Sequence, residues 1–327
     1  MTISVIVPAF NAQNTIGQTL KALQEQDLSD KFEIIVIDDG SVDQTAKIVQ
    51  SFVGVRYLYQ DNAGPAAARN HGARLAQGQI LAFTDSDCIP HKNWLSSLMR
   101  GFVEKDVAVV MGSYGIANDK NLLAYCVYKE ILFRHSRLLP EYPKVFGSYN
   151  FCVKREVFDQ VGGFNELYRH ASGEDNDLSY KIVSKGLRIY FDRQALVDHY
   201  HPVQIKKYLK EQFRHGYWRA VMYRKYPSMA AGDGYTFWKD ALEVPWSFGC
   251  LLALFLSSLN FISYKALALF VLISFLIFEV LFAWVMLQDF LKCFFWGFVM
   301  FLRSFSRAFG LSTGFASFFR KNILNKY

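Results

Sequence analysis

The chain has 327 residues, of which 52% are hydrophobic and 17% aromatic, and its formal net charge is +7. This length allows a globular domain of about 200 to 220 residues and a further, unusually apolar part. A small disulfide-stabilised scaffold is excluded, because the five cysteines have neither disulfide nor zinc-ligand spacing. The positive charge suits a membrane surface or a pyrophosphate ligand, and nucleic acid is disfavoured because no recognition motif is present.

Short apolar runs alternate with helical patterns over the first 85 residues. Ile3 to Val7 and Ile34 to Ile37 are β-branched runs that predict buried parallel strands, and Asn14 or Thr15 can cap a helix between them. The alternation continues with a helix at about 43 to 53, a strand from Val55 to Tyr59, a helix after Gly64-Pro65 and a strand from Ile80 to Thr84. This order predicts an α/β fold with a doubly wound, mostly parallel sheet of a nucleotide-binding type.

Carboxylates follow two of these strands. Asp38-Asp39 comes after the second strand, where it can receive a base imide or ribose hydroxyls, although the same pattern is common in plain turns. Asp85 and Asp87 follow the strand that ends at Thr84. Because alternate residues of an extended segment share a face, both carboxylates can ligate one hard divalent cation.

A third acidic pair, Glu174-Asp175, opens a predicted helix that has Leu178, Ile182 and Val183 on one face. The amides and the dipole of a helix N-terminus favour an ionised acid there. In isolation such a pair is an ordinary helix start. A functional role for Glu174-Asp175 is indicated only because the other acidic clusters are also present.

Six segments occur in an order that resembles the inverting family 2 glycosyltransferases of GT-A fold, and the resemblance covers about residues 2 to 220. These segments are Val5-Ile-Val-Pro-Ala-Phe-Asn11, Val36-Ile-Asp-Asp-Gly-Ser41, Gly64-Pro-Ala-Ala-Ala-Arg-Asn70, Thr84-Asp-Ser-Asp87, Gly162-Gly-Phe-Asn-Glu166 and Gly173-Glu-Asp-Asn-Asp-Leu178.

The resemblance implies a role for each matching position. It implies that the donor nucleotide is bound by Pro8, Ala9, Phe10, Asp38, Asp39, Arg69 and Asp85. It implies that Asp85, Asp87 and His199 hold Mg²⁺ or Mn²⁺ against the diphosphate. It implies that Asp175 is the general base.

Acceptor or secondary contacts are assigned to Glu174, Asn150 and Gln212. Asn165 departs from the family pattern, which usually has Asp after Gly-Gly-Phe, and this weakens an acceptor contact inferred there. Gln212 opens a Gln-x-x-x-Gly segment like that of single-transfer relatives, whereas processive synthases usually carry Gln-x-x-Arg-Trp.

The apolar excess lies near the C-terminus. Val244 to Tyr264 contains no charged residue, and from Ala266 to Gln288 only Glu279 is charged. At 1.5 Å per residue each stretch would span roughly 30 Å as a helix, the thickness of the hydrocarbon core. They predict a transmembrane hairpin, with a pair of buried helices in a soluble core as the alternative. Glu279 is expected to pair between helices or subunits.

Basic residues flank this hairpin. Residues 203 to 224 have apolar positions at helical spacing and many lysines and arginines, which predicts an amphipathic helix at anionic headgroups or one packed on the catalytic domain. After residue 290, phenylalanines interleaved with arginines favour one or two interfacial helices. We therefore expect a GT-A domain at 1–202, an amphipathic region at 203–243, the hairpin at 244–289 and a cytoplasmic or interfacial tail at 290–327.

The predicted function is inverting transfer of a sugar from a nucleotide-diphosphate-sugar donor to a hydroxyl of a membrane lipid or lipid-linked or envelope glycan. A processive polysaccharide synthase, a sugar-nucleotide pyrophosphorylase and a non-catalytic membrane scaffold are the alternatives. With no signal peptide at Met1-Thr2 and basic residues after the hairpin, we expect a multi-pass protein of the cell membrane with its catalytic domain in the cytoplasm. Homo-oligomers through the transmembrane helices are a further expectation.

Overall fold

The computed structural model describes residues 2–28, 31–102, 104–170, 172–228, 235–259 and 262–317. Three basic residues of the predicted tail, Arg320, Lys321 and Lys326, lie outside the described residues, as does Asn260 of the first apolar stretch. The elements are, in chain order, β1 (Ile3–Ala9), α1 (Ile16–Gln24), β2 (Phe32–Asp38), α2 (Thr45–Gln50), β3 (Val55–Tyr59), α3 (Pro65–Leu75), β4 (Ile80–Thr84), β5 (Cys88–Pro90), α4 (Trp94–Arg100), β6 (Val107–Ile116), α5 (Leu122–Arg137), β7 (Asn150–Lys154), α6 (Arg155–Gln160), α7 (Glu174–Val183), β8 (Arg188–His199), α8 (Ile205–Lys225), α9 (Trp238–Ser257), α10 (Ile262–Leu287) and α11 (Phe290–Ser317).

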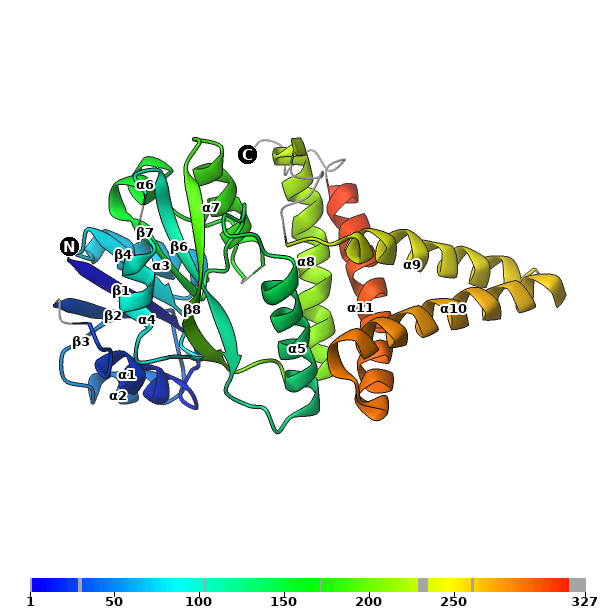
Figure 1. Cartoon of the computed structure of the whole chain (residues 1–327), viewed down its shortest axis with the longest axis horizontal. Helices are drawn as coiled ribbons and strands as arrows, with labels where there is room; N and C mark the ends of the chain where they lie inside the picture. Colours follow the sequence, from blue (N-terminus) through cyan, green and yellow to red (C-terminus); the bar gives the residue numbers. More distant parts are fainter. Residues whose placement is uncertain are drawn as a thin grey trace. The chain divides into compact units, whose positions relative to one another are not determined.

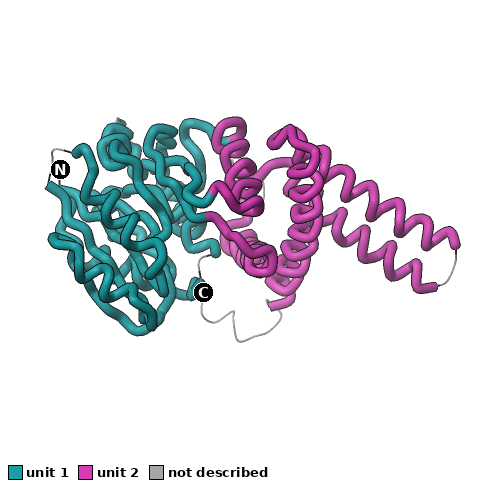
Figure 2. The backbone as a smooth tube through the Cα atoms, turned by 90° about the horizontal axis from the view of Figure 1, so that it is seen from below, with its two compact units in different colours: residues 1–118, 139–200 teal, residues 119–138, 201–327 magenta. Residues whose placement is uncertain are grey.

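The chain divides into two compact units, which Figure 2 distinguishes by colour. The N-terminal unit comprises Met1–Asn118 and Leu139–Tyr200, and the C-terminal unit comprises Asp119–Leu138 and His201–Tyr327. This division differs from the expected boundaries, because α5 leaves the N-terminal unit to join the C-terminal helices. The helices of the expected amphipathic region, hairpin and tail form one unit instead of three segments.

The N-terminal unit is built on an eight-stranded sheet of order β3-β2-β1-β4-β7-β6-β8-β5. The pairs β1–β2, β1–β4, β2–β3 and β6–β8 are parallel, whereas β4–β7, β6–β7 and β5–β8 are antiparallel. The predicted α/β class is confirmed, with a fully parallel half at β3-β2-β1-β4 and a mixed half beyond it (Figure 1).

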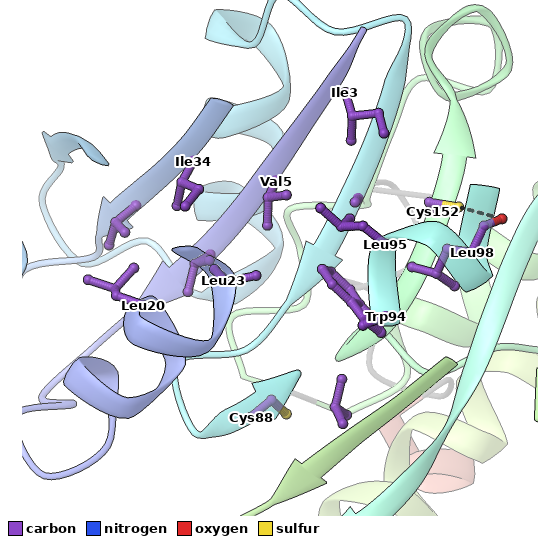
Figure 3. Close-up of a cluster of buried hydrophobic side chains, with 14 of the residues drawn as sticks. Ile3, Val5, Leu20, Leu23, Ile34, Cys88, Trp94, Leu95, Leu98 and Cys152 are labelled. Carbon is purple, nitrogen blue, oxygen red and sulfur yellow. Dashed lines mark hydrogen bonds between the residues drawn. The ribbon is translucent and has the colours of Figure 1, made fainter. Parts of the chain in front are cut away.

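Alternation along the strands gives the sheet two buried faces. Every residue of β1 is buried, as expected for a central parallel strand covered on both sides. On one face, Ile3 and Val5 pack with helix residues that include Leu20, Leu23, Trp94, Leu95 and Leu98 (Figure 3). On the other, Ile35 and Ile37 pack against Ala68 of α3.

Helix α3 lies very close to the sheet because of Gly72. A Cβ atom added at Gly72 would lie 2.5 Å from Cγ2 of Ile6 and 3.2 Å from Cγ1 of Ile37. Any larger residue would push α3 away from β1 and β2. Since α3 also carries Arg69, this close approach helps to place that guanidinium near the end of the sheet.

In the C-terminal unit, α9 and α10 lie side by side as a hairpin that extends away from α8 and α11 (Figure 1). Among the described residues these two helices are long and apolar enough to cross a membrane by length and composition. Their most apolar segments are each only 22% buried, and exposed side chains include Leu252, Phe255, Leu269, Phe270, Ile277 and Leu281. The described part of the predicted tail, residues 290–317, is a single helix, α11, with Phe290, Phe294 and Phe298 exposed near its start.

A buried ionic network joins four helices of this unit. The ion pairs include Arg303–Glu130 at 2.7 Å, Arg134–Asp240 at 2.8 Å and Lys239–Glu279 at 2.7 Å, and Lys239 also contacts Glu243. Glu279, whose partner was open from the sequence, thus pairs between α10 and α9 within one chain.

Candidate active site

Most of the side chains to which we assigned a site role lie near one edge of the sheet. Strands β1, β2 and β4 run parallel, with Ala9 opposite Asp38, so their carboxyl ends open on the same side. In open α/β sheets, ligands bind in the crevice beyond these ends. Strand β7 runs antiparallel to β4 and begins here, with Asn150 opposite Thr84.

The loop after β1 is held against the loop after β2. The amide of Asn11 donates to Oγ of Ser41 at 2.8 Å, and the amide of Val42 donates to Oδ1 of Asn11 at 3.0 Å. Asn11 has a φ of +50°, an angle that Asn tolerates better than most residues. Of the three residues predicted to line the nucleoside pocket, Pro8 and Ala9 are buried, while Phe10 is 52% exposed and therefore open to a stacking ligand.

Asp38 and Asp39 are both buried, and their carboxylates accept hydrogen bonds from the chain itself. Asp38 accepts from the amide of Ser41 and from the Tyr57 hydroxyl, both at 2.8 Å. Burial and the hydrogen bond to Asp38 raise the pKa of Tyr57 to about 12, which keeps this hydroxyl protonated as the donor.

Asp39 organises the turn before α3. It accepts from the side chain of Gln60 at 2.7 Å and from the amides of Ala63 and Gly64, each at 2.9 Å. Gly64 has a φ of +95°, and a Cβ there would lie 2.6 Å from the carbonyl oxygen of Arg169. Asp39 therefore fixes a tight turn at the site.

Arg69 is buried between two carboxylates. Its guanidinium donates to Oδ1 of Asp85 at 2.7 Å and to Oε1 of Glu174 at 3.1 Å, and it lies over the ring of Phe164. Burial opposes the charge, but Asp85 and Glu174 outweigh it and raise the pKa of Arg69, which stays a cation. The sequence predicted a direct contact of Arg69 with the donor, whereas the structure places it between the Asp85 cluster and the Glu174-Asp175 pair.

Asp87, Cys88 and His199 form the only described group of three potential metal ligands, with their ligand atoms within 4.8 Å of one another. The antiparallel register of β5 and β8 pairs Cys88 with His199. Nε2 of His199 lies 3.5 Å from Oδ1 of Asp87, and both side chains are partly exposed. A carboxylate and an imidazole are suitable ligands for Mn²⁺, whereas the buried Cys88 thiol is a poor ligand for a hard cation.

Asp175 lies in the first turn of α7, after Gly173, whose backbone is left-handed with a φ of +98°. Burial, and then the charge of Glu174, raise the pKa of Asp175 to about 7, although backbone hydrogen bonds and Arg69 act in the opposite direction. A carboxyl group with such a pKa is a stronger base than an ordinary aspartate, and it titrates close to neutral pH.

Asn150 and Gln212, two of the residues to which acceptor or secondary contacts were assigned, form hydrogen bonds with other residues of the protein. Asn150 accepts from the indole of Trp94 at 2.7 Å and donates to the carbonyls of Ser113 and Ala195, each at 2.9 Å. This geometry favours a structural role over an acceptor contact. Gln212 belongs to the C-terminal unit, where it accepts from Nε of Arg307 at 2.8 Å.

Sequence reasoning missed two tyrosines beside the candidate metal ligands. The rings of Tyr114 and Tyr149 stack with centroids 3.6 Å apart, and the ring of His199 lies 5.4 Å from Tyr114 and 6.3 Å from Tyr149. Tyr149 directly precedes Asn150, the first residue of β7, which pairs with Thr84. This adjacency to a residue with an assigned site role was the only signal in the sequence for either tyrosine.

Residues 4–171 match the model of the family described as Glycosyl transferase family 2. The match covers half of the chain, so the protein belongs to glycosyl transferase family 2. It is 30% identical over 222 residues to glycosyltransferase AglE of Haloferax volcanii, covering 65% of this chain and 71% of that protein.

A second relative is the pre-mycofactocin glycosyltransferase of Mycobacterium tuberculosis, which is 28% identical over 70% of this chain and 49% of its own length. The chain thus spans about half the length of the first curated relatives it matches. Among solved structures, the mannosyltransferase PcManGT from Pyrobaculum calidifontis in complex with GDP-Man and Mn²⁺ has a TM-score of 0.53 and 22% identity, over 68% of this chain and 63% of that one. This likeness establishes the shared GT-A fold.

Proposed function

We propose that this glycosyltransferase moves a sugar, with inversion, from a nucleotide-diphosphate-sugar donor to a hydroxyl group of a membrane-associated acceptor. The observation that carries the proposal is the separation of two carboxylate centres in one site. Asp85 and Asp87 follow β4, Asp175 opens α7, and the buried Arg69–Glu174 pair stands between them. Inverting transfer needs these two centres, one for the leaving diphosphate and one for the attacking hydroxyl.

Asp175 is the proposed general base. Its pKa of about 7 allows it to be ionised at neutral pH and still to accept a proton from the acceptor hydroxyl as that oxygen attacks the sugar. Hydrogen bonds from the backbone of Asn176 and Ser148 hold the carboxylate in place. A single direct displacement with one base inverts the configuration at the anomeric carbon.

The leaving diphosphate is proposed to lie at Asp85 and Asp87 with Mg²⁺ or Mn²⁺. The donor set fits such an ion, because Asp87, 42% exposed, and His199, 18% exposed, direct an oxygen and a nitrogen toward each other. A cation bound there would offset the charge that develops on the leaving diphosphate. The PcManGT structure, which contains GDP-Man and Mn²⁺, supports this choice of ligand class.

The exposed apolar surface of α9 and α10 supports a membrane-associated acceptor. Trp238 and Trp284 are half-exposed or more near the ends of the hairpin where α9 begins and α10 ends, a position typical of side chains at a membrane interface. We propose that the hairpin crosses the cell membrane, with both of its ends and the N-terminal unit in the cytoplasm.

The function is tested by mixing the purified protein with a panel of nucleotide-diphosphate sugars, a lipid extract and either Mg²⁺ or Mn²⁺. We expect release of nucleoside diphosphate with one donor, stimulated by the lipid extract and stopped by chelator. NMR of the product should show the anomeric configuration opposite to that of the donor. Retained configuration, or release of a free sugar 1-phosphate, would contradict the proposal.

A further inference from the structure

The ion pair between Arg69 and Glu174 is buried, and a buried pair of this kind is not needed to bind a substrate. Arg69 is 1% exposed and Glu174 is 2% exposed. The second oxygen of Glu174 accepts the amide of Ser172 at 2.7 Å, and the Ser148 hydroxyl lies 3.5 Å from the first. Glu174 is therefore a buried charge that neither solvent nor a ligand reaches directly.

This buried charge stands next to the proposed base. Glu174 and Asp175 are consecutive residues in the first turn of α7, and the guanidinium of Arg69, reaching from α3, is the cation that pairs with Glu174. Burying an unpaired carboxylate is costly, so the position of Glu174 depends on Arg69. If the contact between α3 and α7 were only structural, two apolar side chains would make it without the free-energy cost of removing two charges from water.

We propose that Arg69 and Glu174 are positioning residues that set the base strength of Asp175. Glu174 supplies a fixed negative charge that makes Asp175 hold its proton more tightly, and Arg69 keeps Glu174 in place and limits that effect. This inference rests on the proposed role of Asp175 as general base.

The physical reason is the low dielectric around the site, where neighbouring charges act strongly on one another. A stronger base removes the proton of the acceptor hydroxyl more readily, until its pKa exceeds the working pH and too little of it is ionised. The charges that act on Asp175 are Glu174 on the same helix and Arg69 on α3, together with the backbone amides of Asn176 and Ser148. The two side chains of the ion pair have opposite effects.

The test is the pH dependence of kcat/KM, measured with the donor that the panel of nucleotide-diphosphate sugars selects. For the wild-type protein we expect the rate to rise with pH and to level off above about pH 7. Glu174→Gln keeps the size of the side chain and one acceptor oxygen but removes the charge, so the rise should move to lower pH by about one unit or more. A rise at unchanged or higher pH in this variant would overturn the inference.

A second variant tests the effect of Arg69 on the pKa of Asp175, which is opposite to that of Glu174. In Arg69→Gln combined with Glu174→Gln, two neutral amides replace the buried ions and no charge is left unpaired at Glu174. Relative to Glu174→Gln alone, the rise should move back to higher pH. The surface pair of Arg74 and Glu166, 3.5 Å apart and exposed, gives the matched control, and Glu166→Gln should not move the rise. Equal shifts in Glu166→Gln and Glu174→Gln would contradict a specific role.

A readout without turnover separates this inference from the proposed function. Carbodiimides react with protonated carboxyl groups, so labelling of Asp175, mapped by mass spectrometry, should fall as pH rises through about 7 in the wild type. In Glu174→Gln the fall should occur at lower pH. If no donor is turned over but the labelling shifts, the proposed function is wrong and only the effect of Glu174 on the pKa of Asp175 stands. Labelling that does not shift overturns the inference, whatever the activity.

Discussion

At the level of single residues, the acidic side chains of the site differ in what their oxygens contact. Asp39 accepts three hydrogen bonds from the chain, and Asp85 is partly engaged by Arg69. Asp87 keeps 42% of its side chain exposed beside His199. Asp39 thus shapes the site, while Asp87 is open to a ligand.

We expect Asp87→Asn to lower turnover by at least about 100-fold, because the amide is a weaker cation ligand and does not offset charge at the diphosphate. The thermal unfolding temperature should stay unchanged, since Asp87 is on the surface. Asp159→Asn, at an exposed position on α6, is the control and should leave both quantities unchanged. Full activity of Asp87→Asn in chelator would refute the assignment.

Asp175→Asn should lower the rate by about 10² to 10⁴-fold, the usual contribution of a general base, because the amide cannot accept the proton. Binding of the donor, measured by calorimetry, should be retained, since the proposed role of Asp175 is to accept the proton of the acceptor hydroxyl and not to bind the diphosphate. A variant that loses donor affinity while keeping its rate per bound donor would show that Asp175 is a binding residue.

At the level of elements, the ionic network explains how helices with charged residues pack in an apolar unit. Lys239 of α9 contacts both Glu243 on its own helix and Glu279 on α10, and Arg303 of α11 contacts Glu130 of α5. Each charge has a partner, so the network fixes the register of the helices that it joins. Buried ion pairs are weak sources of stability, but breaking one leaves a costly unpaired charge.

Lys239→Met should therefore destabilise the protein by about 3 to 5 kcal/mol, because it leaves Glu279 without its ion-pair partner. Glu279→Met should cost less, since Lys239 keeps Glu243. The double variant should be more stable than the sum of the single changes predicts. Chemical unfolding in detergent measures all three, with Leu281→Ala at an exposed position of α10 as the control; additive losses would contradict the pairing.

At the level of the whole molecule, the prediction concerns membrane topology. All five cysteines are buried, so an introduced surface cysteine is the only reactive thiol expected in the folded protein. Ser263→Cys, in the first turn of α10, should react with an impermeant reagent added outside intact cells. Asp159→Cys, in the N-terminal unit, should react only after permeabilisation.

If Ser263→Cys reacts only after permeabilisation, the hairpin does not cross the membrane and lies within one face of it or inside a soluble assembly. If Asp159→Cys is labelled from outside, the cytoplasmic placement of the N-terminal unit is wrong.

The sequence by itself determined the family and several of the elements, among them β3, β4 and the start of α7. Strands β3 and β4 have the bounds that the sequence predicted. Strand β4 is buried throughout and apolar except for Thr84 because it is a central strand covered on both faces, whereas β3 lies at the edge of the sheet and is only partly buried. The acidic motifs after β2 and β4 and at the start of α7 were visible because each is a short local pattern at the end of an element. The resemblance to family 2 glycosyltransferases was recognisable from these motifs and their order along the chain, without knowledge of the contacts between them.

The tertiary structure decided what these residues touch. The sequence cannot show that Arg69 joins Asp85 to Glu174, because 105 positions separate the two ends of that ion pair. Nor does it show that α5 joins the C-terminal helices, or that Lys239 is the partner of Glu279. Such pairings depend on how the sheet and helices pack in space, and many distant charges of suitable sign compete for each partner until packing selects one.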